Sequence, residues 1–300
     1  MERVWGGRAL ESLYGKQLPP ERKIGESWEI VDRPEAQSVV RTGPWQGRTL
    51  HELWRDHRAE IFGRVPDSER FPILIKLLDA EDKLSLQVHP PPDVAAELGG
   101  EPKCELWYIT HASPEAELYV GVKNETSRRD IEHALARGTV EQYLHRVQVG
   151  AGDAMFLPSG RMHAIGAGLV IVEIQQNSDT TYRVFDWNRR DAQGQERELH
   201  VDASLQSIDF ADVEPGLVRP EGEILVRQFC FAVERWELSQ PRLAAKDGEF
   251  TIVGCLSGSI GCAGSVIRPG EFFLVPASLG ERELRPLAAG SSLLRVSLPG

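Results

Sequence analysis

The stretch at residues 147–165, "VQVGAGDAMFLPSGRMHAI", decides the fold. A Gly, an acidic residue, a mainly apolar run and a Pro follow one another, as in a short strand between two turns. A second phrase at 265–283, "SVIRPGEFFLVPASLGERE", repeats the pattern. Five residues separate Gly from Pro in both, at Gly152 to Pro158 and at Gly270 to Pro276. Two related phrases predict two copies of one β-rich unit.

Short runs rich in β-branched and aromatic residues surround these phrases, and turn residues separate them, which is typical of a sandwich or barrel. Examples are 71–78, 84–89, 105–110, 117–122 and 169–176. Helical spacing over 127–147 predicts two short helices broken at Gly138, with Ser127 as the first N-cap. Residues 45–62 predict another short helix.

A charged, irregular stretch near 188–216 separates the two halves of the β pattern. We therefore predict an N-terminal domain at 1–190, with short helical segments, a connector at 191–220 and a C-terminal domain at 221–300. The expected fold class is mainly β, with two barrels and a few short helices.

Composition narrows the function classes. The formal net charge is −11 and no block of Lys or Arg occurs, which argues against nucleic acid and anionic membranes as partners. The longest apolar run, near 164–172, is too short for a membrane helix of about 20 residues. The charged start "MERVWGGRAL" lacks a secretory signal, and the four cysteines lack metal-ligand spacing. We expect a cytoplasmic protein with reduced thiols.

Four polar residues form a candidate metal site. In "KLSLQVHP" at 83–90, strand alternation places Gln87 and His89 on one face. Glu105 opens a later β run, and His163 follows the Gly/Pro turn. Two imidazoles, a carboxylate and an amide oxygen suit a borderline divalent ion such as Zn²⁺. The alternative for Gln87 is a hydrogen bond to one of the other ligands.

The same residues carry a family resemblance. G-x5-P-x-G-x2-H, ending at His163, resembles the second signature of cupin barrels, and Gln87-x-His89 followed by Glu105 resembles an altered first signature. The phrases "QVHP", "PKCELWYI", "VEIQQNSDTTYRVFDWNR", "VWGG" and "GESWEI" resemble type I phosphomannose isomerases, especially the short bacterial form. The resemblance covers about residues 3–190.

The resemblance implies two jelly-roll cupin barrels and an enzyme that interconverts mannose 6-phosphate and fructose 6-phosphate through a cis-enediol. It implies one Zn²⁺ per chain on Gln87, His89, Glu105 and His163, and a catalytic arginine at Arg183. Further pocket residues of the family match Trp5, Glu29, Lys76, Ser85, Lys103, Glu173 and Asp179. The expected partner is a small sugar phosphate, and the chain is expected to be a monomer or a homodimer.

Roles within this set stay open in part. Glu173, in an otherwise apolar strand, is the first candidate base and Lys103 the second; Glu173 could instead pair with a buried arginine. Arg183 stays protonated and would hold the enediolate or the phosphate. Lys76 and Ser85 are candidate phosphate ligands, although Lys76 could extend to the surface. Trp5 could be a core aromatic.

Two features depart from the larger family members. The chain has no room for their helical insert domain, and Ile165 stands where they often have Tyr. In the second phrase, Glu281 stands where a His would align. No His follows His200, so we expect no metal site in the C-terminal domain, which is expected to be structural or to shield the substrate.

Two other functions compete with the isomerase. A sugar-binding or regulatory cupin could keep the metal without turnover, but it would need no base. A cupin oxygenase would hold Fe(II) on two His and one Glu. The additional Gln and the cationic pocket candidates argue against it.

Overall fold

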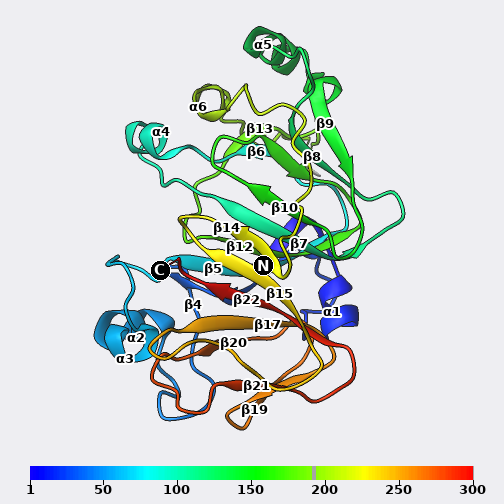
Figure 1. Ribbon diagram of the computed structural model, residues 1–300. Coiled ribbons are helices and arrows are strands. Elements are labelled where there is room, and N and C mark those ends of the chain that lie inside the picture. Colours follow the sequence, from blue (N-terminus) through cyan, green and yellow to red (C-terminus); the bar gives the residue numbers. More distant parts are fainter. Residues whose placement is uncertain (191–193, 300) are drawn as a thin grey trace. The chain divides into compact units, whose positions relative to one another are not determined.

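The structure is a computed structural model that describes residues 1–190 and 194–299, and these residues are mainly β with six α-helices (Figure 1). The chain folds into two compact units. Unit 1 comprises 1–8, 20–26 and 78–218, and unit 2 comprises 9–19, 27–77 and 219–300. No helix in the described ranges is long and apolar enough to cross a membrane. The domain boundaries expected from the sequence stay a prediction.

Two sheets form the framework of unit 1. The first is six-stranded, with the order β1-β5-β12-β7-β10 and with β2 (Glu26–Ile30) paired to β5, of which only residues 78–80 belong to unit 1. The second has the order β13-β6-β11-β8-β9. Their strands are β1 (Glu2–Gly7), β5 (Ile73–Ala80), β6 (Leu86–Val88), β7 (Glu105–Ala112), β8 (Glu117–Val122), β9 (Leu144–Gln148), β10 (Ala154–Leu157), β11 (His163–Ile165), β12 (Leu169–Gln176) and β13 (Tyr182–Phe185). Both orders end in edge strands, so a closed barrel is not seen in the described residues.

The core of unit 1 lies between these sheets. Trp107 and Ile109 are two residues apart in β7, so they point to the same face of the sheet. They share one buried cluster with Leu118 and Val120 of β8 and Ile165 of β11. Each such side chain contributes about 1.5–3 kcal/mol relative to an exposed position. Because the cluster draws on both sheets, residues in phase with Trp107 point into the interior.

The helices of unit 1 are α4 (Pro92–Glu97), α5 (Arg128–Ala136), the 3₁₀ turn η1 (Val140–Tyr143) and α6 (Val201–Ser207). The Ser127 cap is confirmed: its hydroxyl accepts from the backbone N–H of Asp130, whose carboxylate accepts from the N–H of Ser127. Helix α6 lies within the predicted connector, whose residues 191–193 fall outside the described ranges, and it packs against β13, β6 and α4.

The second predicted helix of 127–147 is wrong over its last residues. Leu144–Gln148 is strand β9, which pairs with β8 through Leu118↔Val147 and Val122↔Leu144. The spacing of Leu144 and Val147 fits a helix, but pairing with an otherwise open sheet edge determines the conformation.

Unit 2 also contains two sheets, of orders β14-β15-β22-β17-β20 and β16-β21-β18-β19, and a small β3-β4 ribbon. Their strands are β14 (Ile224–Arg227), β15 (Ala232–Leu238), β22 (Ser291–Ser297), β17 (Thr251–Ser257), β20 (Phe272–Val275), β16 (Arg242–Leu243), β21 (Glu283–Pro286), β18 (Ile260–Cys262), β19 (Ser265–Ile267), β3 (Asp32–Arg33) and β4 (Ala36–Gln37). Trp236 and Leu293 of the first sheet share a buried cluster with Ile260 and Leu284 of the second. Strand β2 (Glu26–Ile30), like β5, has residues in each unit.

The helices of unit 2 are α1 (Ala9–Tyr14), α2 (Leu50–Asp56) and α3 (Arg58–Phe62). The helix predicted over 45–62 is confirmed only for residues 50–62, which form the two helices α2 and α3. Thr49 caps α2 through a capping box.

The expectation of reduced thiols is correct for Cys255 and Cys262, which are free and buried. It is wrong for Cys104 and Cys230, which are disulfide-bonded.

Candidate metal centre

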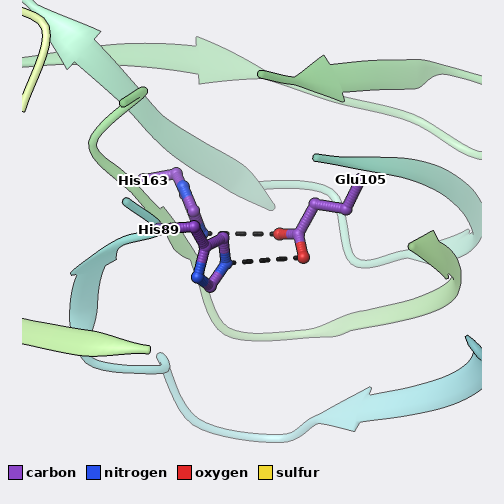
Figure 2. A group of neighbouring side chains, drawn as sticks. All are labelled: His89, Glu105 and His163. Atoms are coloured by element: carbon purple, nitrogen blue, oxygen red, sulfur yellow. Dashed lines mark ion pairs between the residues drawn. The ribbon is translucent and has the colours of Figure 1, made fainter. Parts of the chain in front are cut away.

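Three predicted ligands meet inside unit 1. His89 follows β6, Glu105 begins β7 and His163 begins β11, and each is at most 1 % exposed. One ligand atom from each lies within 4.8 Å of the others. Figure 2 shows both imidazole rings turned toward the Glu105 carboxylate, with His89 Nε2 3.5 Å from Oε2 and His163 Nε2 3.4 Å from Oε1. The prediction that these three residues lie together is confirmed.

Backbone carbonyls fix the tautomers of both histidines. His89 Nδ1 lies 3.0 Å from the Thr180 carbonyl, and His163 Nδ1 lies 2.8 Å from the Arg161 carbonyl. A carbonyl only accepts, so each Nδ1 carries the proton and each neutral ring directs the lone pair of Nε2 toward Glu105. Such a contact to a metal-ligating histidine also sets ring orientation.

The protonation states follow from burial and charge. Burial, followed by the Lys103 ammonium, lowers the pKa of His89 to about 4, and burial also lowers the pKa of His163. For Glu105, burial raises the pKa, but Lys103 and the two histidines outweigh it and hold the pKa well below its usual range. At neutral pH the site therefore presents two neutral imidazoles and one carboxylate.

These groups fit a cation. Within the described residues, both Nε2 atoms and both Glu105 oxygens are buried without a hydrogen-bond partner, although Oε2 has an ion pair with Lys103. Two lone pairs facing a carboxylate at 3.4–3.5 Å repel it, and each unsatisfied buried polar atom costs about 1–3 kcal/mol. A divalent ion among these atoms removes both penalties, and the mixed N/O donor set suits Zn²⁺.

Strand register places Gln87 and Arg183 beside the cluster. In the second sheet Gln87 lies opposite His163 of β11 on one side and opposite Arg183 of β13 on the other. Residues that face each other across strands project from the same face. Gln87 is half-buried, so a role as fourth ligand agrees with its place in the sheet and stays a prediction.

The first sheet contributes the opposite wall. Glu173 of β12 lies opposite Trp107 of β7, and Trp107 Nε1 donates to Glu173 Oε2 at 3.0 Å. The Trp107 ring also meets the His163 ring edge-on, with centroids 5.3 Å apart. One tryptophan therefore contacts both a metal-ligand candidate and the candidate base. Lys103, buried before β7, pairs with Glu105 through Nζ and Oε2 at 3.2 Å.

Arg183 is held on one side only. Its Nη1 donates to the Glu198 carbonyl at 2.6 Å, whereas its Nε is buried and has no partner among the described residues. Burial, followed by the nearby charge of Arg197, lowers its pKa. The guanidinium thus retains a buried N–H that no acceptor among the described residues meets.

The other predicted pocket residues are more scattered. In unit 1 Ser85 is buried before β6, Asp179 is exposed, and Trp5 lies in the core cluster that contains Trp107. The core position agrees with the alternative role of Trp5 and leaves a substrate contact untested.

Two predicted pocket residues belong to unit 2. Lys76 is buried with its Nζ 5.3 Å from the Trp28 ring centroid, and Glu29 pairs with Lys16 at 2.7 Å. A role for either residue toward the substrate stays a prediction.

Comparison with known proteins identifies the family. A family model described as phosphomannose isomerase type I, catalytic domain, matches residues 1–99. Mannose-6-phosphate isomerase ManA of Bacillus subtilis (strain 168) is 37% identical over 303 residues, which cover 96% of this chain and 94% of that protein. The chain belongs to the type I phosphomannose isomerases. A Streptococcus mutans mannose-6-phosphate isomerase is 36% identical over 93% of the chain and 90% of its own length.

Solved structures agree with the family assignment. The crystal structure of mannose 6-phosphate isomerase from Bacillus subtilis superposes with a TM-score of 0.86 at 32% identity, covering 99% of this chain and 97% of that one. A mannose 6-phosphate isomerase bound with zinc and yttrium shares the fold, with a TM-score of 0.74 at 17% identity, covering 100% of this chain and 97% of that one.

Sequence reasoning missed two residues of this phosphomannose isomerase fold near the centre. Trp107 reads as one more apolar residue of β7. Gln175 lies opposite Glu105 and is fully buried; its Nε2 donates to the carbonyls of Gln176 and Ser178, while its Oε1 has no partner among the described residues. The pattern of apolar residues in the sequence indicates neither the Trp107–Glu173 hydrogen bond nor the position of Gln175 opposite Glu105. Both depend on pairing between strands that lie far apart in the chain.

Proposed function

We propose that this phosphomannose isomerase family member is a zinc-dependent aldose–ketose isomerase that interconverts mannose 6-phosphate and fructose 6-phosphate through a cis-enediol. The observation that carries the proposal is the buried trio of His89, Glu105 and His163, with two neutral imidazole lone pairs facing one carboxylate. Two relatives that match almost the whole chain are named mannose-6-phosphate isomerase.

His89, Glu105 and His163 would hold one Zn²⁺ per chain, with Gln87 as the fourth ligand. When bound, Zn²⁺ supplies Lewis-acid stabilisation of the negative charge that develops on oxygen. Burial of the ligands keeps competing water out and strengthens every charge interaction in the site. Lys103, paired with Glu105, fixes the orientation of that carboxylate.

The chain's own residues move the proton. Glu173 is the proposed base that carries hydrogen between C1 and C2, and the Trp107 N–H fixes one of its carboxylate oxygens. Lys103 is the second candidate. Arg183 stays protonated and would donate from Nε to the enediolate oxygen or the phosphate. Lys76, Ser85, Trp5, Glu29 and Asp179 are proposed to line the sugar-phosphate site.

The other proposals concern the rest of the molecule. Two cupin-type barrels, a cytoplasmic location and a monomer or homodimer remain part of the proposal, as does a structural or shielding role for residues 221–300. Sequence supports that last role, because the segment after His200 contains no His for a second site of the same kind.

A coupled assay tests the proposed function. Fructose 6-phosphate formation from mannose 6-phosphate is followed in zinc-replete protein, after chelation and after zinc is restored. We expect turnover, loss and recovery. A zinc-replete protein that binds fructose 6-phosphate without turnover would instead establish the alternative, a non-catalytic sugar-binding or regulatory cupin.

A further inference from the structure

His200 makes an unusual pair of contacts with Arg183. The backbone N–H of His200 donates to the Arg183 carbonyl at 2.8 Å, and the Arg183 N–H donates to His200 Nδ1 at 3.0 Å. The first contact is ordinary backbone pairing. In the second, an imidazole nitrogen takes the place that a neighbouring strand's carbonyl would occupy.

The position of β13 explains why such an acceptor is needed. β13 is the edge strand of the second sheet, so no further strand of the described residues lies on the outer side of Arg183. Both its backbone groups bond outward to His200, so Arg183 and Gln87 form a non-hydrogen-bonded pair, the type in which facing side chains lie closest. This arrangement brings the Arg183 side chain toward the metal-ligand candidate.

The same short segment holds the guanidinium. Two residues before His200, the Glu198 carbonyl accepts from Arg183 Nη1 at 2.6 Å. Helix α6, which begins directly after His200, packs against β13 and β6 and anchors the segment. Three hydrogen bonds with residues 198–200 therefore fix the Arg183 backbone and one side of its guanidinium. The buried Nε–H has no acceptor in the part of the chain that the structure describes.

We propose that His200 is a positioning residue for Arg183. The Nδ1 atom of His200 accepts from the Arg183 backbone N–H and fixes that backbone, so that the Nε–H of the Arg183 guanidinium meets the substrate oxygen. The proposal rests on the proposed function, because it requires Arg183 to contact the sugar phosphate. His200 must carry its ring proton on Nε2, since Nδ1 accepts.

Substitutions of His200 that remove or move the acceptor for the Arg183 backbone N–H test the positioning role. His200→Ala removes it and is expected to lower kcat/KM on the order of 10²-fold, the cost of a misplaced catalytic group. His200→Asn puts an amide oxygen where Nδ1 lies and is expected to recover most of the loss. His200→Gln reaches instead to the position of Nε2 and is expected to stay low. His133→Ala, at an exposed position on α5, is the control and is expected to match the wild type.

A double substitution separates positioning from general stability. In an Arg183→Ala background, His200→Ala is expected to cost nothing more, because the group it positions is gone. Three outcomes would overturn the proposal. They are wild-type kcat/KM in His200→Ala, equal losses of kcat/KM in His200→Asn and His200→Ala, and a loss caused by His200→Ala that is as large in the Arg183→Ala background as in the wild type. If His200→Ala fails to fold, the comparison of the Asn and Gln variants decides.

The test is separable from that of the proposed function. Wild-type turnover tests the isomerase. If the wild type does not turn over, calorimetric affinity for fructose 6-phosphate across the same variants tests His200, with the same order expected and equal affinities contradicting it.

Discussion

Protonation of His89 should destabilise the metal-free protein in mild acid. Burial, then Lys103, lowers the pKa of His89 from 6.5 to about 4 in the folded chain. Between these values the unfolded chain binds a proton that the folded chain does not, so stability falls as the pH drops below about 6.5 and levels off near 4. Between pH 7 and pH 5 this one group removes about 2 kcal/mol of unfolding free energy.

Urea unfolding of chelated protein at pH 7 and pH 5 measures the effect. His89→Gln removes the titrating imidazole. Between pH 7 and pH 5 its unfolding free energy should fall by about 2 kcal/mol less than that of the wild type, whatever the stability of the variant at pH 7. His133→Gln, at an exposed position, should lose as much as the wild type. Equal losses in wild type and His89→Gln would refute the assignment of His89 as a buried neutral imidazole.

Three further substitutions test the divided roles. Glu105→Gln removes the only carboxylate of the trio and should lower zinc affinity by at least about 10²-fold, measured by competition with a chelator. Glu173→Gln should lower kcat by about 10²–10⁴-fold at full zinc occupancy, and unchanged kcat would exclude it as the base. Trp107→Phe removes the N–H donor to Glu173 and should lower kcat about tenfold or more while zinc stays bound; a kcat equal to wild type would show that this hydrogen bond does not matter.

The candidate metal ligands could be predicted because local rules place them. The i, i+2 spacing of Gln87 and His89 fixes their common face in any strand, and turn residues fix the start of the strand at His163. Strand β6 is shorter than the predicted run at 84–89, covering Leu86–Val88, but the alternation still holds. The family resemblance added Arg183, which spacing alone leaves far from the histidines.

The missed features depend on contacts between distant strands. The i, i+3 spacing of Leu144 and Val147 fits a helix, and only pairing with the edge of β8 makes this segment a strand. The hydrogen bond from Trp107 to Glu173 joins residues 66 apart in the chain. His200 sits in a charged stretch with no periodicity, so nothing local indicates that its ring completes the edge of β13.

Activity measured against zinc equivalents tests the central claim most directly. Metal-free protein is titrated with zinc, and fructose 6-phosphate formation is followed at each step. On the proposal that one buried trio holds the ion, activity should rise linearly and stop at about one equivalent per chain, and a His163→Ala variant should not respond. Full turnover in the metal-free protein, or a response in the variant equal to wild type, would contradict the account.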